Sequence, residues 1–314
     1  MTKKYIYYVL LIFSIFAIDH LFLQNVLFKT SFQCSSIKRC SLLTSLQFAT
    51  PLIILGLSFI VAYKSKLFNL GQEGQMYLGI LFSGYLGYGF DLPDNIHSIV
   101  ISIGAIIVGG LYGWFAGWLK IRLGINEIIS TIILSEIIIN APISNIIRIP
   151  YYGRIDETAM LKVFAPGSKF GTGFVIAVFA VILVYIYLWK SGRGYEQRMS
   201  GEAPRFAFFG GIKSEKAALR GMFISGGLAG LAGAIEVMGV HYRIVNLPIN
   251  FDGMLVGFIS FLNPILVFFV SIIVGGLRNG FQLGLQYTLG LPREVGSIIL
   301  ISFLILLFLK KKVN

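Results

Sequence analysis

The sequence predicts an all-α fold, a polytopic transmembrane helical bundle. Hydrophobic residues make up 56% of the 314 residues and charged residues only 13%, about half the charged fraction of a soluble domain. The apolar residues also gather in runs of about 20, the length that a helix needs to cross roughly 30 Å of hydrocarbon. We therefore expect one transmembrane domain over residues 1–314, without a separate soluble domain.

We predict about ten crossings. The first, 5–24, follows Lys3 and Lys4 without a small-x-small cleavage site, which favours an uncleaved helix over a signal peptide. The second, 43–63, ends before Lys64. A polar break opens the third, and the fifth is an isoleucine-rich helix with a polar strip. The third to sixth are 68–90, 96–119, 125–147 and 171–189, and the last four are 219–240, 251–262, 265–280 and 295–309.

The basic residues orient this bundle. The net charge is +12, and most of the 26 lysine and arginine residues fall in the segments that lie in the cytoplasm if the N-terminus does. This is the positive-inside bias of membrane proteins. It places both termini in the cytoplasm and explains the charge without a nucleic-acid partner.

No catalytic or metal-binding arrangement appears in the sequence. His20, His97 and His241 are isolated, and neither a Walker-A loop nor a catalytic triad is present. We expect no metal, no cofactor and no enzyme activity in this chain. Cys34 and Cys40, in the predicted first external loop, either form a small disulfide or stay unpaired, which we favour.

Residues 68–76, with the sequence FNLGQEGQM, interrupt the third crossing with polar side chains. An ionisable group at membrane depth costs about 2.5–3.5 kcal/mol on insertion scales. Interrupted helices of this kind line the binding sites of transporters. We therefore predict that Asn69, Glu73 and Gln75 line a path, while Gly71 and Gly74 shape the backbone.

The eighth crossing begins similarly, with Asn250, Asp252 and Gly253. Matching polar, glycine-containing breaks in two halves of a chain indicate an inverted repeat around a central site. We state the repeat as a hypothesis and add Asp252 to the path candidates.

The fifth crossing carries a polar strip at helical i, i+4 spacing. Asn126 pairs with Ser130, Glu127 with Thr131, and Glu136 with Asn140. We assign Asn126, Glu127 and Ser130 to the path, and Glu136 to hydrogen bonds between neighbouring helices. Small-residue stripes at 109/113/117 and 226/230/234 predict close helix packing within the bundle.

The predicted cytoplasmic loop 190–218 is the longest on its side. Its residues 202–209 predict a short helix with Pro204 near the first turn. Three phenylalanines on it, Phe206, Phe208 and Phe209, either meet a protein partner or dip into lipid headgroups.

Five segments together resemble the permeases of ABC importers, in the simple-sugar, nucleoside and branched-chain amino-acid group. Residues 68–76 resemble the F-N-I-G-x-E-G-Q-M signature of the nucleoside branch, and NEIIST at 126–131 is similar to its N-E-V-x-S-T. Residues 201–212 resemble the cytoplasmic G-x-N-P-x-A-A-x-x-x-G-I, and 225–234 resemble S-G-x-L-A-G-L-A-G-A. The pair 251–253 and 263–264 resembles G-F-D-G…H-P. The sequence departs from the family pattern at Ala203, Phe206, Phe208 and Asn263.

This resemblance implies the membrane-spanning subunit of an importer in the cytoplasmic membrane, translocating nucleosides by alternating access. It implies an ATP-binding subunit that holds ATP and Mg²⁺, a homologous second permease subunit and an external substrate-binding protein. A short coupling helix would dock on the ATPase through Gly201, Glu202, Ala203, Pro204, Arg205, Phe206 and Gly211. The alternatives are a permease for ribose or another simple sugar and, in a different class, a carrier driven by an ion gradient at Glu73 or Glu127.

Overall fold

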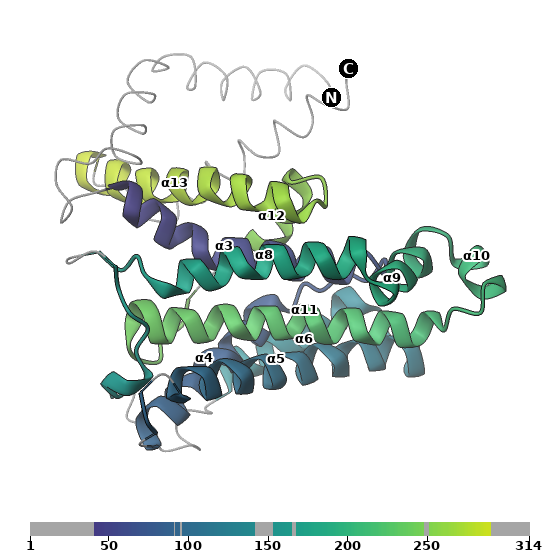
Figure 1. Cartoon of the computed structure of the whole chain (residues 1–314), viewed down its shortest axis with the longest axis horizontal. Coiled ribbons are helices and arrows are strands. Elements are labelled where there is room, and N and C mark those ends of the chain that lie inside the picture. Colours follow the sequence, from purple (N-terminus) through teal and green to yellow (C-terminus); the bar gives the residue numbers. More distant parts are fainter. Residues whose placement is uncertain are drawn as a thin grey trace, which may run out of the picture.

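Every regular element in the described part of the chain is a helix. The computed structural model describes residues 41–90, 92–94, 96–141, 153–164, 168–247 and 251–289. Their helices run roughly parallel or antiparallel to one another (Figure 1). The all-α prediction is confirmed for these residues. The predicted crossings 5–24 and 295–309, and both cysteines, lie outside the described residues.

The helices follow the predicted order. They are α3 (Ser41–Tyr63), α4 (Gln72–Gly89), α5 (Ile96–Leu123), α6 (Glu127–Asn140), α8 (Thr172–Lys190), α9 (Gly192–Glu202), α10 (Pro204–Phe209), α11 (Ser214–Glu236), α12 (Asp252–Ile259) and α13 (Pro264–Leu289). A 3-10 turn, η2 (Glu157–Ala159), precedes α8, and a π-helical turn, η3 (Val237–His241), extends α11.

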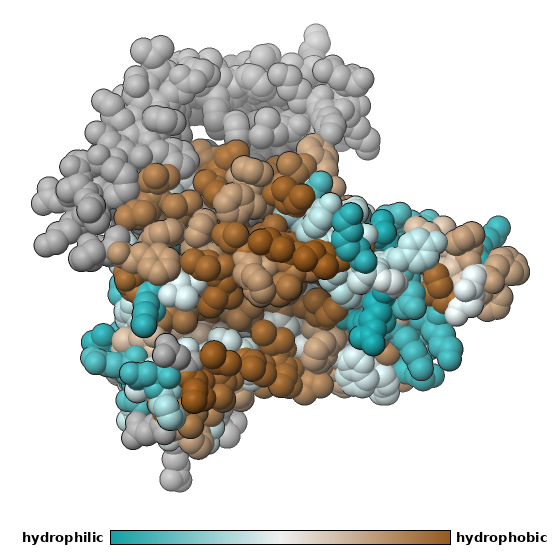
Figure 2. Space-filling model, in the orientation of Figure 1, coloured by the Kyte–Doolittle hydropathy of each residue, from teal (hydrophilic) through white to brown (hydrophobic). Residues whose placement is uncertain are grey.

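Four of these helices are long and apolar enough to cross a membrane: α3, α5, α8, and α11 with its π-helical turn. On α5, Ile99, Ile103, Ile107 and Leu111 lie four residues apart and are all exposed. Such a row is unfavourable in water but suits contact with lipid. The surface of the bundle forms an apolar band with polar residues at both ends (Figure 2).

The small-residue stripes of α5 and α11 pack against each other. A Cβ atom built on Gly109 would lie 2.5 Å from the carbonyl oxygen of Gly226, and one on Gly113 would lie 2.5 Å from that of Met222. Each distance is too short for a real side chain, so glycine is what allows the two backbones to approach. The prediction of close packing within the bundle is confirmed for this pair of helices.

Two predicted crossings differ from the structure. Residues Phe68–Gly71 are not helical, so α4 begins four residues later than the predicted segment. The eighth crossing is wrong as a spanning helix, because α12 has 8 residues and covers only about 12 Å. Phe261 and Leu262, with φ of 52° and 58°, turn the chain from α12 into α13.

The fifth crossing is also shorter in the described residues. α6 ends at Asn140, and residues 142–147 of the predicted segment lie outside the described part of the chain. The count of ten crossings and the inverted repeat stay predictions.

Candidate functional site

The polar break before α4 folds into a hydrogen-bonded network inside the bundle. The Asn69 side chain is fully buried and Gln75 is 1% exposed. Asn69 Nδ2 donates to Gln75 Oε1 at 2.7 Å, and Gln75 Nε2 donates back to Asn69 Oδ1 at 3.0 Å. The backbone N–H of Gly71 also donates to Asn69 Oδ1, at 3.2 Å. The two amides therefore satisfy each other and hold the turn that starts α4.

Serines from α3 and α11 complete the network. Asn69 Nδ2 donates to Ser225 Oγ at 2.8 Å, and Ser58 Oγ donates to the Ser225 carbonyl oxygen at 2.8 Å. Gln72 Nε2 donates to Ser58 Oγ and to the carbonyl oxygen of Leu55, both at 2.7 Å. The start of α4 is thus tied to the middle of both α3 and α11.

Hydroxyl groups of α6 accept from one N–H group in the first turn of α4 and from one just before it. The N–H of Gly74 donates to Ser135 Oγ at 2.7 Å, and that of Leu70 donates to Thr131 Oγ1 at 3.3 Å. The first N–H groups of a helix have no partner within it. A Cβ on Gly71 would lie 2.6 Å from the carbonyl oxygen of Thr131, so this glycine permits the approach. The expectation that Gly71 and Gly74 shape the backbone fits this geometry.

Of the seven path candidates, Asn69 and Gln75 bond to each other through their side chains, and both are buried in the network. Glu73 is half-buried in the first turn of α4. On α6, Asn126 is the exposed N-cap, accepting the N–H of Ile128 at 2.9 Å. Ser130 is buried, and its Oγ donates to the Glu127 carbonyl oxygen at 3.3 Å.

Two carboxylates among the candidates form ion pairs. Glu127 Oε2 lies 2.9 Å from Lys120 Nζ of α5. Asp252 Oδ2, in the first turn of α12, accepts from Arg278 Nη1 of α13 at 2.6 Å. The Asp252 and Arg278 side chains are 19% and 25% exposed. A close pair largely removed from water compensates each charge where an isolated one would be costly.

Glu136 does not join α6 to another helix by any hydrogen bond among the described residues. Its Oε2 accepts from Asn140 Nδ2 of the same helix at 2.9 Å, and both residues are exposed. The interpretation of Glu136 as a bond between helices is therefore wrong for this part of the chain. The neighbouring residues make the bonds to other helices instead. Ser135 Oγ accepts from α4, and the carbonyl oxygen of Leu134 accepts from Tyr112 Oη of α5 at 2.8 Å.

Sequence reasoning missed several residues that hold this region together. They are Ser58, Gln72, Ser135, Ser225 and Arg278. Arg278 did carry a signal, because it is a basic residue within an apolar run. The serines carried none, since a hydroxyl is common in membrane helices.

The other candidate region projects from the end of the bundle. α10 lies beyond α9 at its far end (Figure 1). Phe206, Phe208 and Phe209 are 59%, 76% and 86% exposed, while Ala207 between them is fully buried. Pro204 occupies the first turn of α10, as predicted, and Gly211, with φ of 74°, ends the turn that follows. Glu202 belongs to α9 instead.

Basic residues gather at this same end. Lys64 after α3 pairs with Glu202 of α9 at 3.7 Å, and its ammonium lies 5.2 Å from the centre of the Trp189 ring. Burial under α9 lowers the pKa of Lys64, and the Glu202 carboxylate partly opposes this. Figure 2 shows the polar surface around α9 and, at the tip, the apolar α10.

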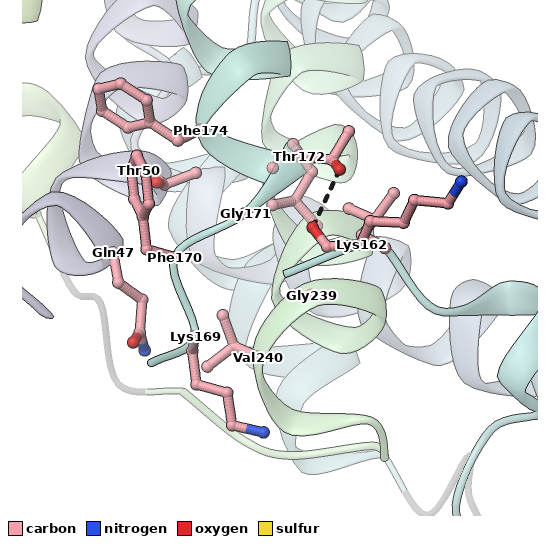
Figure 3. A pocket seen from close by; sticks show the side chains of 13 residues that line it. Gln47, Thr50, Lys162, Lys169, Phe170, Gly171, Thr172, Phe174, Gly239 and Val240 are labelled. Carbon is pink, nitrogen blue, oxygen red and sulfur yellow. Dashed lines mark hydrogen bonds between the residues drawn. The ribbon is translucent and has the colours of Figure 1, made fainter. Parts of the chain in front are cut away.

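At the opposite end of α3, a small cavity lies between α3, α8 and the π-helical turn η3. Gln47, Thr50, Lys169 and Phe170 are among its lining residues, and Thr172 Oγ1 donates to the Lys162 carbonyl oxygen at 3.0 Å beside it (Figure 3). Its volume of about 10 Å³ has room for about one water molecule. This cavity cannot hold a nucleoside or a sugar.

Comparison with known proteins decides the class of protein to which this arrangement belongs. The family model described as "Branched-chain amino acid transport system / permease component" matches residues 41–309. The chain belongs to this permease family. The permease is therefore a multi-pass membrane protein, as its apolar helices also indicate.

Relatives over most of the permease are subunits of ABC transporters. The guanosine ABC transporter permease protein of Bacillus subtilis is 32% identical over 265 residues, 80% of this chain and 76% of that protein. The nucleoside ABC transporter permease protein of Lactococcus lactis is 27% identical over 287 residues, 85% of this chain and 78% of that protein. A glucose ABC transporter permease protein of Haloferax volcanii is 27% identical, over 62% of this chain and 56% of that protein. No solved structure matches the chain significantly.

Proposed function

We propose that this permease is the membrane-spanning subunit of an ABC importer that carries nucleosides across the cytoplasmic membrane. The observation that carries the proposal is the similarity to guanosine and nucleoside permeases over at least 80% of the chain. The signature at 68–76 supports it, because these residues form the network that positions α4 against α3, α6 and α11.

A separate ATP-binding subunit, holding ATP and Mg²⁺, would supply the energy. Its docking site on the permease is α10 with its flanks, from Gly201 to Gly211. Three exposed phenylalanines on one short helix favour a protein partner. Without one, side chains such as Phe209, which is 86% exposed, would leave apolar surface in water at the polar end of the bundle. In this proposal the end with Lys64 and α9 faces the cytoplasm, because basic residues favour that side of the membrane. Both chain termini are proposed to lie on the same side.

The cargo path lies, in this proposal, between the permease and a homologous second permease subunit. Asn126, Glu127 and Ser130 lie in the first turns of α6, from the exposed Asn126 to the buried Ser130. Glu73 and Asp252 lie at the starts of α4 and α12. Asn69 and Gln75 would hold the helices that line the path without contacting cargo, because their amides already hydrogen-bond to each other. An external substrate-binding protein would deliver the cargo.

A simple sugar is the second candidate cargo, and the similarity to a glucose permease favours it. A competition assay separates the two classes. The transporter is reconstituted in liposomes, with the binding protein on the side that corresponds to the cell exterior. Uptake of radiolabelled guanosine is then measured while other nucleosides, ribose or glucose are added in excess. Inhibition by nucleosides and not by sugars supports the proposal. Inhibition by ribose or glucose alone would show that the cargo is a sugar and would contradict the proposal of a nucleoside importer.

A further inference from the structure

One buried side chain, Gln197 of α9, joins four helices at the base of the exposed α10. It is fully buried. Tyr187 Oη of α8 donates to Gln197 Oε1 at 2.6 Å, and Gln197 Nε2 donates to the carbonyl oxygen of Val61, in the last turn of α3, at 2.5 Å. On α11, a Cβ built on Gly221 would lie 2.6 Å from the same Nε2. The side chain therefore contacts α3, α8 and α11 from α9.

The bond to Val61 has a physical reason. The last four carbonyl groups of a helix lack an N–H partner within it. At the end of α3, the carbonyl oxygens of Ile60, Ala62 and Tyr63 accept from the N–H groups of the following turn, Lys64 to Leu67. Gln197 supplies a donor to Val61, so the end of α3 is capped by a side chain of α9.

Backbone contacts also fasten α9 at both its ends. A Cβ on Gly194 would lie 2.8 Å from Leu188 Cα of α8, and one on Gly201 would lie 3.0 Å from the carbonyl carbon of Ser65 after α3. Neither glycine can accept a side chain without moving its neighbour. The first turns of α9 thus rest on α8, and its last turn rests on the end of α3.

Two ion pairs accompany these contacts but lie nearer the surface. Arg220 of α11 pairs with Glu196 at 2.8 Å, with 27% and 45% of the side chains exposed, and Lys64 pairs with Glu202. Pairs exposed to this degree contribute little, because water screens them. Loss of Gln197 instead leaves the buried carbonyl oxygen of Val61 without this donor, which costs its desolvation, and removes the bond to the part-buried Tyr187. The amide is therefore the most deeply buried of these polar links between α9 and the bundle.

We infer that Gln197 is a positioning residue that transmits movement of α10 to α3, α8 and α11 together. The inference rests on the proposed function, in which an ATP-binding subunit pulls on α10. Because α9 and α10 are separated only by Ala203, a displacement of α10 reaches Gln197 within two helical turns. The end of α3 then moves with α9, and α3 also carries Ser58 and Leu55 of the network at the start of α4.

Two variants test this link in different ways. Gln197→Leu keeps a similar side-chain volume and removes both hydrogen bonds. Tyr187→Phe removes only the bond from α8 and leaves the cap on Val61. Arg193→Gln is the matched control, since it changes a polar residue of α9 whose side chain makes no hydrogen bond or ion pair to α3 among the described residues. The complete transporter is reconstituted in liposomes, and guanosine uptake and ATP hydrolysis are measured in the same vesicles.

For Gln197→Leu we expect ATP hydrolysis within about twofold of the unchanged transporter and uptake lowered roughly tenfold, so the ATP used per guanosine rises by a similar factor. Tyr187→Phe should raise this ratio less, and Arg193→Gln should leave it unchanged. A residue that only stabilised the fold would lower hydrolysis and uptake in proportion, and that result overturns the inference. An unchanged ratio in both variants overturns it as well.

The same experiment separates the inference from the function on which it rests. If the unchanged transporter takes up guanosine at the expense of ATP and the variants behave like it, only the role of Gln197 is lost. If the unchanged transporter shows no ATP-driven uptake, the proposed function and the role of Gln197 both fall. Should Gln197→Leu fail to assemble, Tyr187→Phe still decides, because it must raise the ratio measurably.

Discussion

Gly253 at the start of α12 lies against the side chain of Gln72 at the start of α4. A Cβ built on Gly253 would lie 2.5 Å from Gln72 Oε1 and 2.9 Å from Leu55 Cβ of α3. The two helices diverge from this point. Phe258 of α12 packs edge-to-face against Tyr63 at the end of α3, while Gly87 of α4 approaches Ile155 near the opposite end of the bundle. Two interrupted segments, 180 residues apart in the sequence, thus begin side by side inside the bundle.

The contact between Gly253 and Gln72 predicts that a side chain at 253 destabilises the permease. Gly253→Val should lower the free energy of unfolding by about 1–3 kcal/mol, because it overpacks a filled interior. Thermal unfolding in detergent measures this. Gly192→Ala is the control, since nothing lies within 4 Å of a Cβ there. Equal melting temperatures for the two variants would contradict the packing.

The buried pair of Asn69 and Gln75 predicts a structural role without cargo contact. Asn69→Leu removes the partner of the Gln75 amide and of the Gly71 N–H and should cost about 1–3 kcal/mol of stability. Uptake should fall with the amount of folded protein, and the order of preference among competing nucleosides should stay the same. A changed order of preference would place Asn69 on the path.

The ion pair between Asp252 and Arg278 predicts a strong coupling between these two positions. Asp252→Asn and Arg278→Gln each remove this ion pair, which is destabilising where the two side chains are largely removed from water. The double variant should be more stable than the sum of the two single effects predicts, by about 0.5–3 kcal/mol. Strictly additive losses in thermal unfolding would show that the pair contributes nothing.

The exposed phenylalanines of α10 predict a docking surface for the ATP-binding subunit. Phe206→Glu should abolish co-purification with that subunit and lower uptake, while thermal unfolding of the permease alone stays unchanged because Phe206 is 59% exposed. Phe164→Glu is the matched control, since Phe164 is 55% exposed before α8, at the other end of the bundle. If both variants retain the ATP-binding subunit equally, α10 is not the docking site.

The sequence predicted those helices that begin or end where an apolar run meets a charged residue. α3 ends at Tyr63 because Lys64 follows, and α5 begins at Ile96 as expected. The stripes around Gly109 and Gly226 predicted a close contact, because small side chains in membrane helices let neighbouring backbones approach each other. The short helix with Pro204 in its first turn was also predicted from a local signal, although its start was placed at Glu202, which belongs to α9.

The partners within the network could not be predicted. Ser58 and Ser225 are 167 residues apart, and Gly74 and Ser135 are 61 apart, so each bond depends on how whole helices pack. Asn69 and Gln75 were selected as polar groups at membrane depth, and the sequence alone does not tell a path from a mutual hydrogen bond. The shortness of α12 was missed because apolarity continues to Leu262 after the helix ends.

The energy source of guanosine uptake tests the account most directly. The transporter, assembled with its ATP-binding subunit and binding protein, is reconstituted in liposomes in which ATP and the ion gradients are set separately. We predict that guanosine uptake requires ATP hydrolysis, persists when the ion gradients are collapsed, and is lost in Phe206→Glu. Uptake that continues without ATP and stops when an ion gradient is removed would contradict the account and identify a carrier driven by that gradient.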